Sequence, residues 1–126
     1  MKKYIPFIKK ITEGTVDFSR GRKREIVFDG KLPIFAGNIC YESIFKDSIN
    51  KNAKLIISIT NDSWFGTTSG PYQHFSNLKL RAVENKIPVI RVGNSGISAV
   101  IDGFGRVHKK IKLNKKDIID IKIPLI

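Results

Sequence analysis

The residue best suited to covalent chemistry is Cys40, the only cysteine in the 126-residue chain. An apolar stretch ends just before it at Ile39 and residues with helical spacing follow, so we expect Cys40 at a strand-to-helix corner, a recurring place for a nucleophile. The N–H groups at a helix start favour a thiolate and can hold an oxyanion formed by attack on a carbonyl. The alternative is a small buried core residue, which is the commoner role of a free cysteine.

Partners for this thiol are few. The chain has two histidines, His74 and His108, and neither has a neighbouring acidic residue that would obviously orient it as a base. Glu42 is close to the thiol, but a carboxylate in the first turn of a helix is also favoured simply by the helix dipole. Two histidines, one cysteine and scattered carboxylates do not form a zinc set, and one cysteine excludes an intrachain disulfide. We therefore predict no metal and no cofactor.

The polar loop 61–70 is the second unusual feature. It follows an apolar, β-branched run at 54–60 that predicts a buried strand, and open α/β sheets place ligand sites at the carboxyl ends of such strands. Trp64 and Phe65 in this loop could wall an apolar substrate pocket, or they could fold back into the core. Asn61 is a candidate binding residue here, although an asparagine also suits a turn, as does Asp62.

The remaining pattern predicts an α/β fold with a mixed β-sheet, in which strands and helices alternate before a final hairpin. A helix is expected from Pro71, and a further helix after Cys40 with Ile44, Phe45 and Ile49 on one side. Turn signals at 29–30 and 102–105 predict two hairpins. The expected strands are 25–28, 32–39, 54–60, 88–92, 97–101, 107–113 and 117–123.

The formal net charge of +12 is concentrated at the two ends of the chain. Residues 1–24 carry eight basic and two acidic side chains, residues 106–126 carry seven and two, and the middle carries eight and seven. Nucleic-acid binding would favour a basic stripe interleaved with aromatic residues, but most aromatic residues lie in the near-neutral middle. We therefore expect no nucleic-acid partner, and keep a basic module for nucleic acid or anionic lipid as an alternative hypothesis.

The first ten residues resemble a signal peptide only briefly. Their apolar run is interrupted by Pro6 and ends at Lys9, which is too short for a signal core. No stretch approaches the ~20 apolar residues of a membrane span. The sequence thus predicts neither a signal nor a transmembrane segment, and a cytoplasmic location for this chain by itself.

Three segments go beyond a generic α/β pattern. They are GNICYE at 37–42, TNDSWFG at 60–66 continuing to GPYQH at 70–74, and RAVE at 81–84 followed by GNSGI at 93–97. In this order and spacing they resemble the carbon–nitrogen hydrolase (nitrilase) superfamily, and within it the apolipoprotein N-acyltransferases. The resemblance implies an αββα sandwich, of which residues 25–113 would be the C-terminal half of the catalytic domain. Residues 1–24 would be a basic, loop-like N-terminal segment, and residues 114–126 a tail or an edge strand.

The resemblance also implies a reaction. Enzymes of this family transfer an acyl chain from a phospholipid to the diacylglyceryl-cysteine at the N-terminus of a lipoprotein, at the periplasmic face of the bacterial inner membrane. By resemblance Cys40 is the nucleophile that forms a thioester, the backbone N–H of Tyr41 helps bind the oxyanion, and Glu42 is a supporting acidic residue. Trp64 would contact the acyl chain or the lipoprotein, with Phe65 and Asn61 beside it.

One departure from the family pattern is serious. The family's catalytic triad is Glu–Lys–Cys, and the stretch that carries its glutamate and lysine has no match in these 126 residues. The resemblance therefore predicts a fragment that is inactive alone, because loss of general-base help costs roughly 10²–10⁴ in rate. A separate chain that supplies the missing half is a possible partner. The alternative within the superfamily is a fragment of an amidase or nitrilase.

Overall fold

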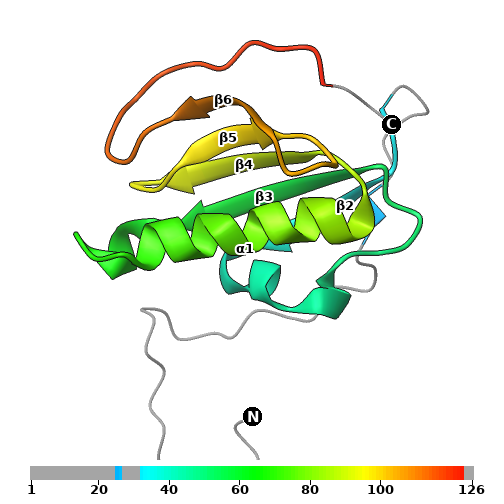
Figure 1. Ribbon diagram of the computed structural model, residues 1–126, viewed down its shortest axis with the longest axis horizontal. Coiled ribbons are helices and arrows are strands. Elements are labelled where there is room, and N and C mark those ends of the chain that lie inside the picture. Colours follow the sequence, from blue (N-terminus) through cyan, green and yellow to red (C-terminus); the bar gives the residue numbers. More distant parts are fainter. Residues whose placement is uncertain (1–24, 27–31, 124–126) are drawn as a thin grey trace, which may run out of the picture.

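The computed structural model describes residues 25–26 and 32–123. Its described part contains a mixed six-stranded sheet whose strands lie side by side in chain order, from β1 to β6 (Figure 1). The central strands β2, β3 and β4 are parallel, and the outer pairs β1–β2, β4–β5 and β5–β6 are antiparallel. The strands are β1 (Glu25–Ile26), β2 (Phe35–Ile39), β3 (Leu55–Asn61), β4 (Val89–Asn94), β5 (Ser98–Ile101) and β6 (Val107–Ile111).

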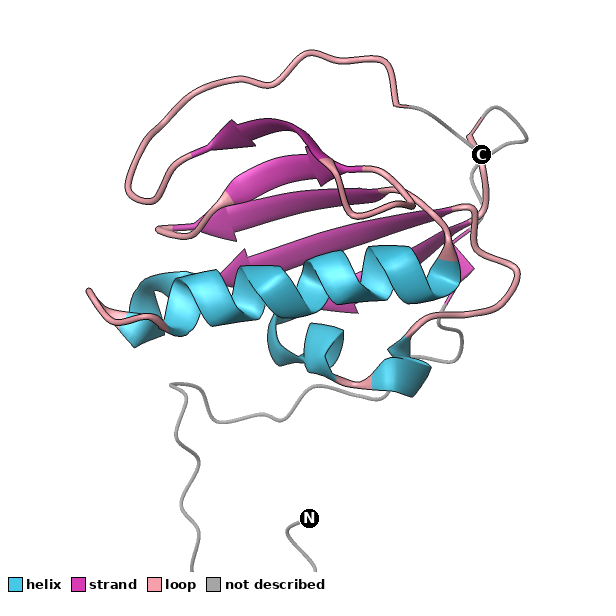
Figure 2. Cartoon of the chain, in the orientation of Figure 1, coloured by secondary structure: helices cyan, strands magenta, loops and turns pink. Residues whose placement is uncertain are grey.

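The helix α1 (Gly70–Asn85) connects β3 to β4 and lies across one face of the sheet (Figure 2). Pro71 stands in its first turn, where the missing N–H costs nothing, as the sequence predicts. Its apolar stripe of Phe75, Leu78 and Ala82 is buried against the sheet. This layer is the hydrophobic core, to which the sheet contributes Ala36, Ile56, Val89, Ala99 and Ile101.

The C-terminal hairpin forms where the sequence predicts it. The N–H of Gly105 donates to the carbonyl of Asp102, and Gly105 has the positive φ of +80° that glycine adopts readily. The Asp102 carboxylate also accepts hydrogen bonds from Arg106 and His108. Burial alone would raise the pKa of Asp102, but the hydrogen bonds from His108, from Arg106 and from the Phe104 N–H outweigh it and hold that pKa well below its usual range. The other expected turn, at 29–30, lies outside the described residues.

The predicted helix after Cys40 is wrong in type. The segment forms two short 3₁₀ helices, η1 (Cys40–Ile44) and η2 (Lys46–Ser48). Phe45 between them has extended backbone angles (φ −85°, ψ 127°), which ends the first helix at Ile44. Ile49 is therefore buried while Phe45 is 59% exposed, although regular helical spacing would have put both on one face.

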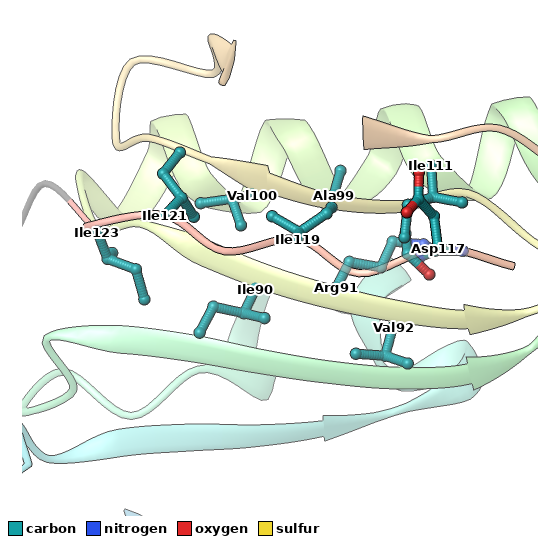
Figure 3. Close-up of a pocket in the computed structure, with 11 residues that line it drawn as sticks. Ile90, Arg91, Val92, Ala99, Val100, Ile111, Asp117, Ile119, Ile121 and Ile123 are labelled. Carbon is teal, nitrogen blue, oxygen red and sulfur yellow. The ribbon is translucent and has the colours of Figure 1, made fainter. Parts of the chain in front are cut away.

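The strand expected at 117–123 is not formed. This segment instead runs over the sheet face opposite α1, where Ile119, Ile121 and Ile123 line a hollow together with Ile90 and Val100 (Figure 3). Isoleucine stands at every second position from 119 to 123, and this spacing fits the packing, because an extended segment presents every second side chain to the surface beneath it.

The same face carries a row of exposed apolar side chains near the carboxyl ends of the parallel strands. Ile39, Ile59 and Val92 are neighbours across β2, β3 and β4 and are 62%, 51% and 52% exposed. On the α1 side, the neighbouring row of Asn38, Ser58 and Arg91 is fully buried. Within the described residues, the apolar row at Ile59 is thus left open while the polar row beneath α1 is covered.

Candidate active site

Cys40 lies at the end of β2, where the chain turns into η1, so the predicted strand-to-helix corner is present. Its φ is +50°, in the left-handed region that residues other than glycine, asparagine and aspartate rarely adopt. Such a conformation costs of order 1–3 kcal/mol and persists only where the surroundings hold it. The thiol is half-buried, so Cys40 is not the enclosed core residue that the alternative interpretation expected.

The corner opens onto a hollow at the carboxyl edge of the three parallel strands. Here β2, β3 and β4 end together, which is where open α/β sheets place ligands. The hollow measures about 390 Å³, and the exposed row of Ile39, Ile59 and Val92 supplies its apolar lining. Its complete lining is Ile39, Cys40, Ile59, Thr60, Asn61, Val92 and Asn94.

Beneath this edge lies a buried ionic cluster centred on Asp62, the first residue of the 3₁₀ helix η3 (Asp62–Phe65). The Asp62 carboxylate accepts from Arg91 Nη2 at 2.6 Å, from His74 Nδ1 at 2.9 Å and from Thr60 Oγ1 at 3.0 Å. Burial lowers the pKa of Arg91, and the charge and hydrogen bond of Asp62 oppose that shift. A side chain at Gly96 would meet the same carboxylate, so this position has room only for glycine.

His74 links the Asp62 cluster to the nucleophile corner. It is 4% exposed, and its Nε2 lies 3.1 Å from the carbonyl oxygen of Cys40 and 2.9 Å from Ser43 Oγ. The acidic residue that orients this histidine is Asp62, which lies twelve positions earlier and is therefore not recognisable as its neighbour in the sequence. A signal for the cluster existed in Arg91, a charge within an apolar strand that needs a buried partner.

The residues next to the thiol occupy different places. Glu42 is exposed, and its carboxylate accepts a hydrogen bond from the Ile39 N–H at 2.8 Å, so it holds the turn at the end of β2. The ring of Tyr41 is 58% exposed and packs edge-on against Phe45. Tyr41 contributes its N–H to the peptide unit whose carbonyl belongs to Cys40.

The three candidates from the polar loop are separated by the structure. Asn61 lines the hollow beside Cys40, and its Oδ1 accepts from Asn94 Nδ2 at 3.0 Å across β3 and β4. Phe65 is half-buried and packs on the His74 ring, with 5.8 Å between ring centroids. Trp64 is 75% exposed, so it neither fills the core nor lines this hollow.

The described residues contain no group of three or more histidine, cysteine, aspartate or glutamate side chains arranged to hold a metal ion. No helix among them has the length and apolar character needed to cross a membrane.

A half-buried cysteine on a strained corner, at the carboxyl edge of a mixed α/β sheet, defines a candidate thiol-nucleophile site. Comparison with known proteins agrees with that class. Residues 5–125 match the carbon-nitrogen hydrolase family, and the chain belongs to this family.

Several relatives bear the name apolipoprotein N-acyltransferase. The protein of Rickettsia typhi is 46% identical over 98% of this chain and 25% of its own length, and that of Rickettsia bellii is 49% identical over 90% and 23%. The protein of Allorhizobium ampelinum is 48% identical over 80% of this chain and 20% of its own length. The chain thus spans about a quarter of the length of these relatives.

Solved structures show the same fold. An amidase from Nesterenkonia sp. superposes with a TM-score of 0.58 at 21% identity, covering 77% of this chain and 40% of the amidase. A carbon-nitrogen hydrolase from Helicobacter pylori superposes with a TM-score of 0.57 at 14% identity, covering 65% and 37%. The chain therefore has a partial nitrilase-like α/β fold with a mixed sheet, as its motifs indicate.

Proposed function

We propose that this chain carries the nucleophile half of an apolipoprotein N-acyltransferase active site. The observation that carries the proposal is Cys40 on its left-handed corner beside an apolar hollow, in a chain 46% identical to a relative of that name. An apolar lining at Ile59 and Val92 suits an acyl chain better than a small polar amide.

The proposed reaction has two steps. The base of the triad takes the Cys40 thiol proton, the thiolate attacks the carbonyl of a phospholipid ester, and the C–O bond to the lyso-phospholipid breaks as the base returns that proton to the leaving oxygen. The free α-amine of a diacylglyceryl-cysteine then attacks the thioester, the C–S bond breaks, and the amine proton passes through the base to the Cys40 sulfur. The Tyr41 N–H would donate to the oxyanion in both steps. Both substrates carry lipid chains, so the proposed reaction takes place at a membrane surface. The resemblance to the apolipoprotein N-acyltransferases implies the periplasmic side of that membrane.

We propose that the base and the lysine of the triad come from a segment that corresponds to the part of the relatives preceding the matched region. Two carboxylates near the corner make structural contacts: Glu42 accepts from the Ile39 N–H, and Asp62 is paired with Arg91 and His74. Asp62 is thus held by its cations, and Glu42 holds the turn at the end of β2. The open apolar row through Ile59 supports such a segment as well, because the sandwich of the family would cover that face.

The test is a phospholipid acyl-transfer assay with a lipopeptide acceptor. The purified chain alone is expected to show no turnover above a Cys40→Ala control. Addition of the segment that precedes the matched region in the Rickettsia typhi relative is expected to restore turnover that Cys40→Ala abolishes. Turnover by the chain alone that depends on Cys40 would contradict the proposed division of the site.

The fold likeness to an amidase supports a second candidate, hydrolysis of a soluble amide. The same reconstituted pair, screened against short aliphatic amides, separates the two. Amide hydrolysis without acyl transfer to the lipopeptide would favour this second function.

A further inference from the structure

We infer that His74 is a positioning residue for the oxyanion site and acts through the peptide bond between Cys40 and Tyr41. The inference rests on the proposed function, in which the Tyr41 N–H binds the oxyanion. It starts from the 3.1 Å contact between His74 Nε2 and the Cys40 carbonyl oxygen. That oxygen and the Tyr41 N–H are opposite ends of one planar peptide unit.

The carboxylate and carbonyl partners of His74 are consistent with a proton on each ring nitrogen. Nδ1 faces a carboxylate oxygen of Asp62 at 2.9 Å, and an ionised carboxylate only accepts. Nε2 faces the Cys40 carbonyl, which also only accepts, and the Ser43 hydroxyl, which can donate or accept. When His74 donates to both the carboxylate and the carbonyl, each ring nitrogen carries a proton. Arg91 Nη2 lies 3.3 Å from Nδ1 and donates to the other oxygen of Asp62, so the guanidinium and the imidazole share one carboxylate.

A donor on the Cys40 carbonyl has two effects on the N–H at the other end of the peptide. It fixes the orientation of the peptide plane in a residue whose φ of +50° is otherwise unfavourable. It also polarises the amide, which strengthens the N–H as a donor by roughly 10–30%. Ser43 Oγ, 3.3 Å from the same carbonyl, adds a weaker second donor. Asp62 and Arg91 are buried, so the ring of His74 is held against this peptide from behind.

The size of the effect follows from what an oxyanion donor contributes. Loss of one donor costs about 10²–10³ in rate, and 10–30% of that on a logarithmic scale is about two- to eightfold. The effect should appear only in reactions that form an oxyanion. The effect of His74 should be absent when the same thiolate takes part in a reaction that forms no oxyanion.

The chain offers a clean test because Cys40 is its only thiol. Two rate constants are measured by intact mass at one pH: acylation by p-nitrophenyl butyrate, which passes through an oxyanion, and alkylation by iodoacetamide, which does not. The rate constant for acylation is divided by that for alkylation, which cancels the thiolate fraction because both reagents react with the thiolate. This ratio is then compared with the same ratio for glutathione, a thiol without an oxyanion site. The wild-type ratio is expected to exceed that of glutathione, and His74→Leu is expected to lower it by about two- to eightfold.

Two control variants sharpen the result. His74→Gln keeps an N–H donor near the position of Nε2 and should restore most of the ratio. His108→Leu removes the other histidine, which lies in the β5–β6 hairpin against Asp102, and should leave the ratio unchanged. A wild-type ratio equal to that of glutathione would refute the oxyanion role itself and with it the proposed function. A raised wild-type ratio that His74→Leu does not lower would refute this inference alone.

A spectroscopic measurement covers the case in which His74→Leu does not fold. With ¹⁵N-histidine labelling, the two histidines of the wild-type chain give separate ring signals. Protonated Nε2 and Nδ1 are expected for His74. An unprotonated Nε2 would overturn the inference, because such a nitrogen cannot donate to the Cys40 carbonyl.

Discussion

Replacement of Arg91 by methionine should destabilise the chain strongly, because it leaves the Asp62 carboxylate buried without its closest cation. Arg91 Nη2 donates to Asp62 at 2.6 Å and Arg91 Nε donates to the Ile97 carbonyl at 3.1 Å, and both donors are lost. Removal of one partner of a buried ion pair costs about 3–5 kcal/mol. Arg91 Nη1 is itself buried without a hydrogen-bond partner, so removing it offsets part of the stability lost in Arg91→Met. We therefore expect the lower end, about 3 kcal/mol, for Arg91→Met.

The assay is urea denaturation followed by far-UV circular dichroism, with the m-value checked for constancy. A double-mutant cycle with Asp62→Asn isolates the pair, since the neutral amide no longer needs a cation. The cost of Arg91→Met should fall by about 2 kcal/mol or more in the Asp62→Asn background. A cost below about 1 kcal/mol, or costs that add within about 0.5 kcal/mol, would refute the view that this ion pair organises the edge of the sheet.

Three further predictions follow from the same structure. In urea titrations, Cys40→Gly should be more stable than Cys40→Ala by about 1 kcal/mol, because glycine adopts the φ of +50° without strain. Equal stability of the two variants would contradict the left-handed conformation at this corner. Gly96→Ala should lower the free energy of unfolding by about 1–3 kcal/mol, because its Cβ would overlap the Asp62 carboxylate, and an unchanged melting temperature would contradict that contact. Because the pKa of Asp102 is lowered in the folded state, this carboxylate should contribute stability that is present above about pH 4 and is lost as the pH falls further. Asp102→Asn should therefore make the melting temperature depend less on pH in the acid range. An unchanged dependence would count against the hairpin hydrogen bonds.

The parallel core of the fold could be predicted from the sequence. Runs such as Leu55–Asn61 are continuous and β-branched, and the periodicity after Pro71 has one clear apolar face. These patterns depend only on residues that are close in the sequence, so they predict the element without knowledge of the tertiary structure. The segment after Cys40 was harder, because a single extended residue, Phe45, divides it into two short 3₁₀ helices that spacing alone does not distinguish from one helix.

The site could be predicted only in part. Cys40 was identifiable from its place after an apolar run, and the motif around it identifies the family. The cluster of Asp62, His74 and Arg91 could not be identified from the sequence. Its members lie on η3, α1 and β4, and only the crossover from β3 through α1 to β4 brings them together. The exposed side chain of Trp64 was equally hidden, since a sequence gives no sign of which way an aromatic loop residue turns.

The most direct test of the central claim is whether Cys40 becomes acylated by a phospholipid only when the other half of the site is present. The chain, the preceding segment of the Rickettsia typhi relative and phospholipid vesicles are mixed without an acceptor amine, and the chain is examined by intact mass. We predict one acyl group on the chain, removed by neutral hydroxylamine as a thioester is, and absent both in Cys40→Ser and in the chain alone. Acylation of Cys40→Ser at the same rate, or of the chain without its complement, would contradict the account.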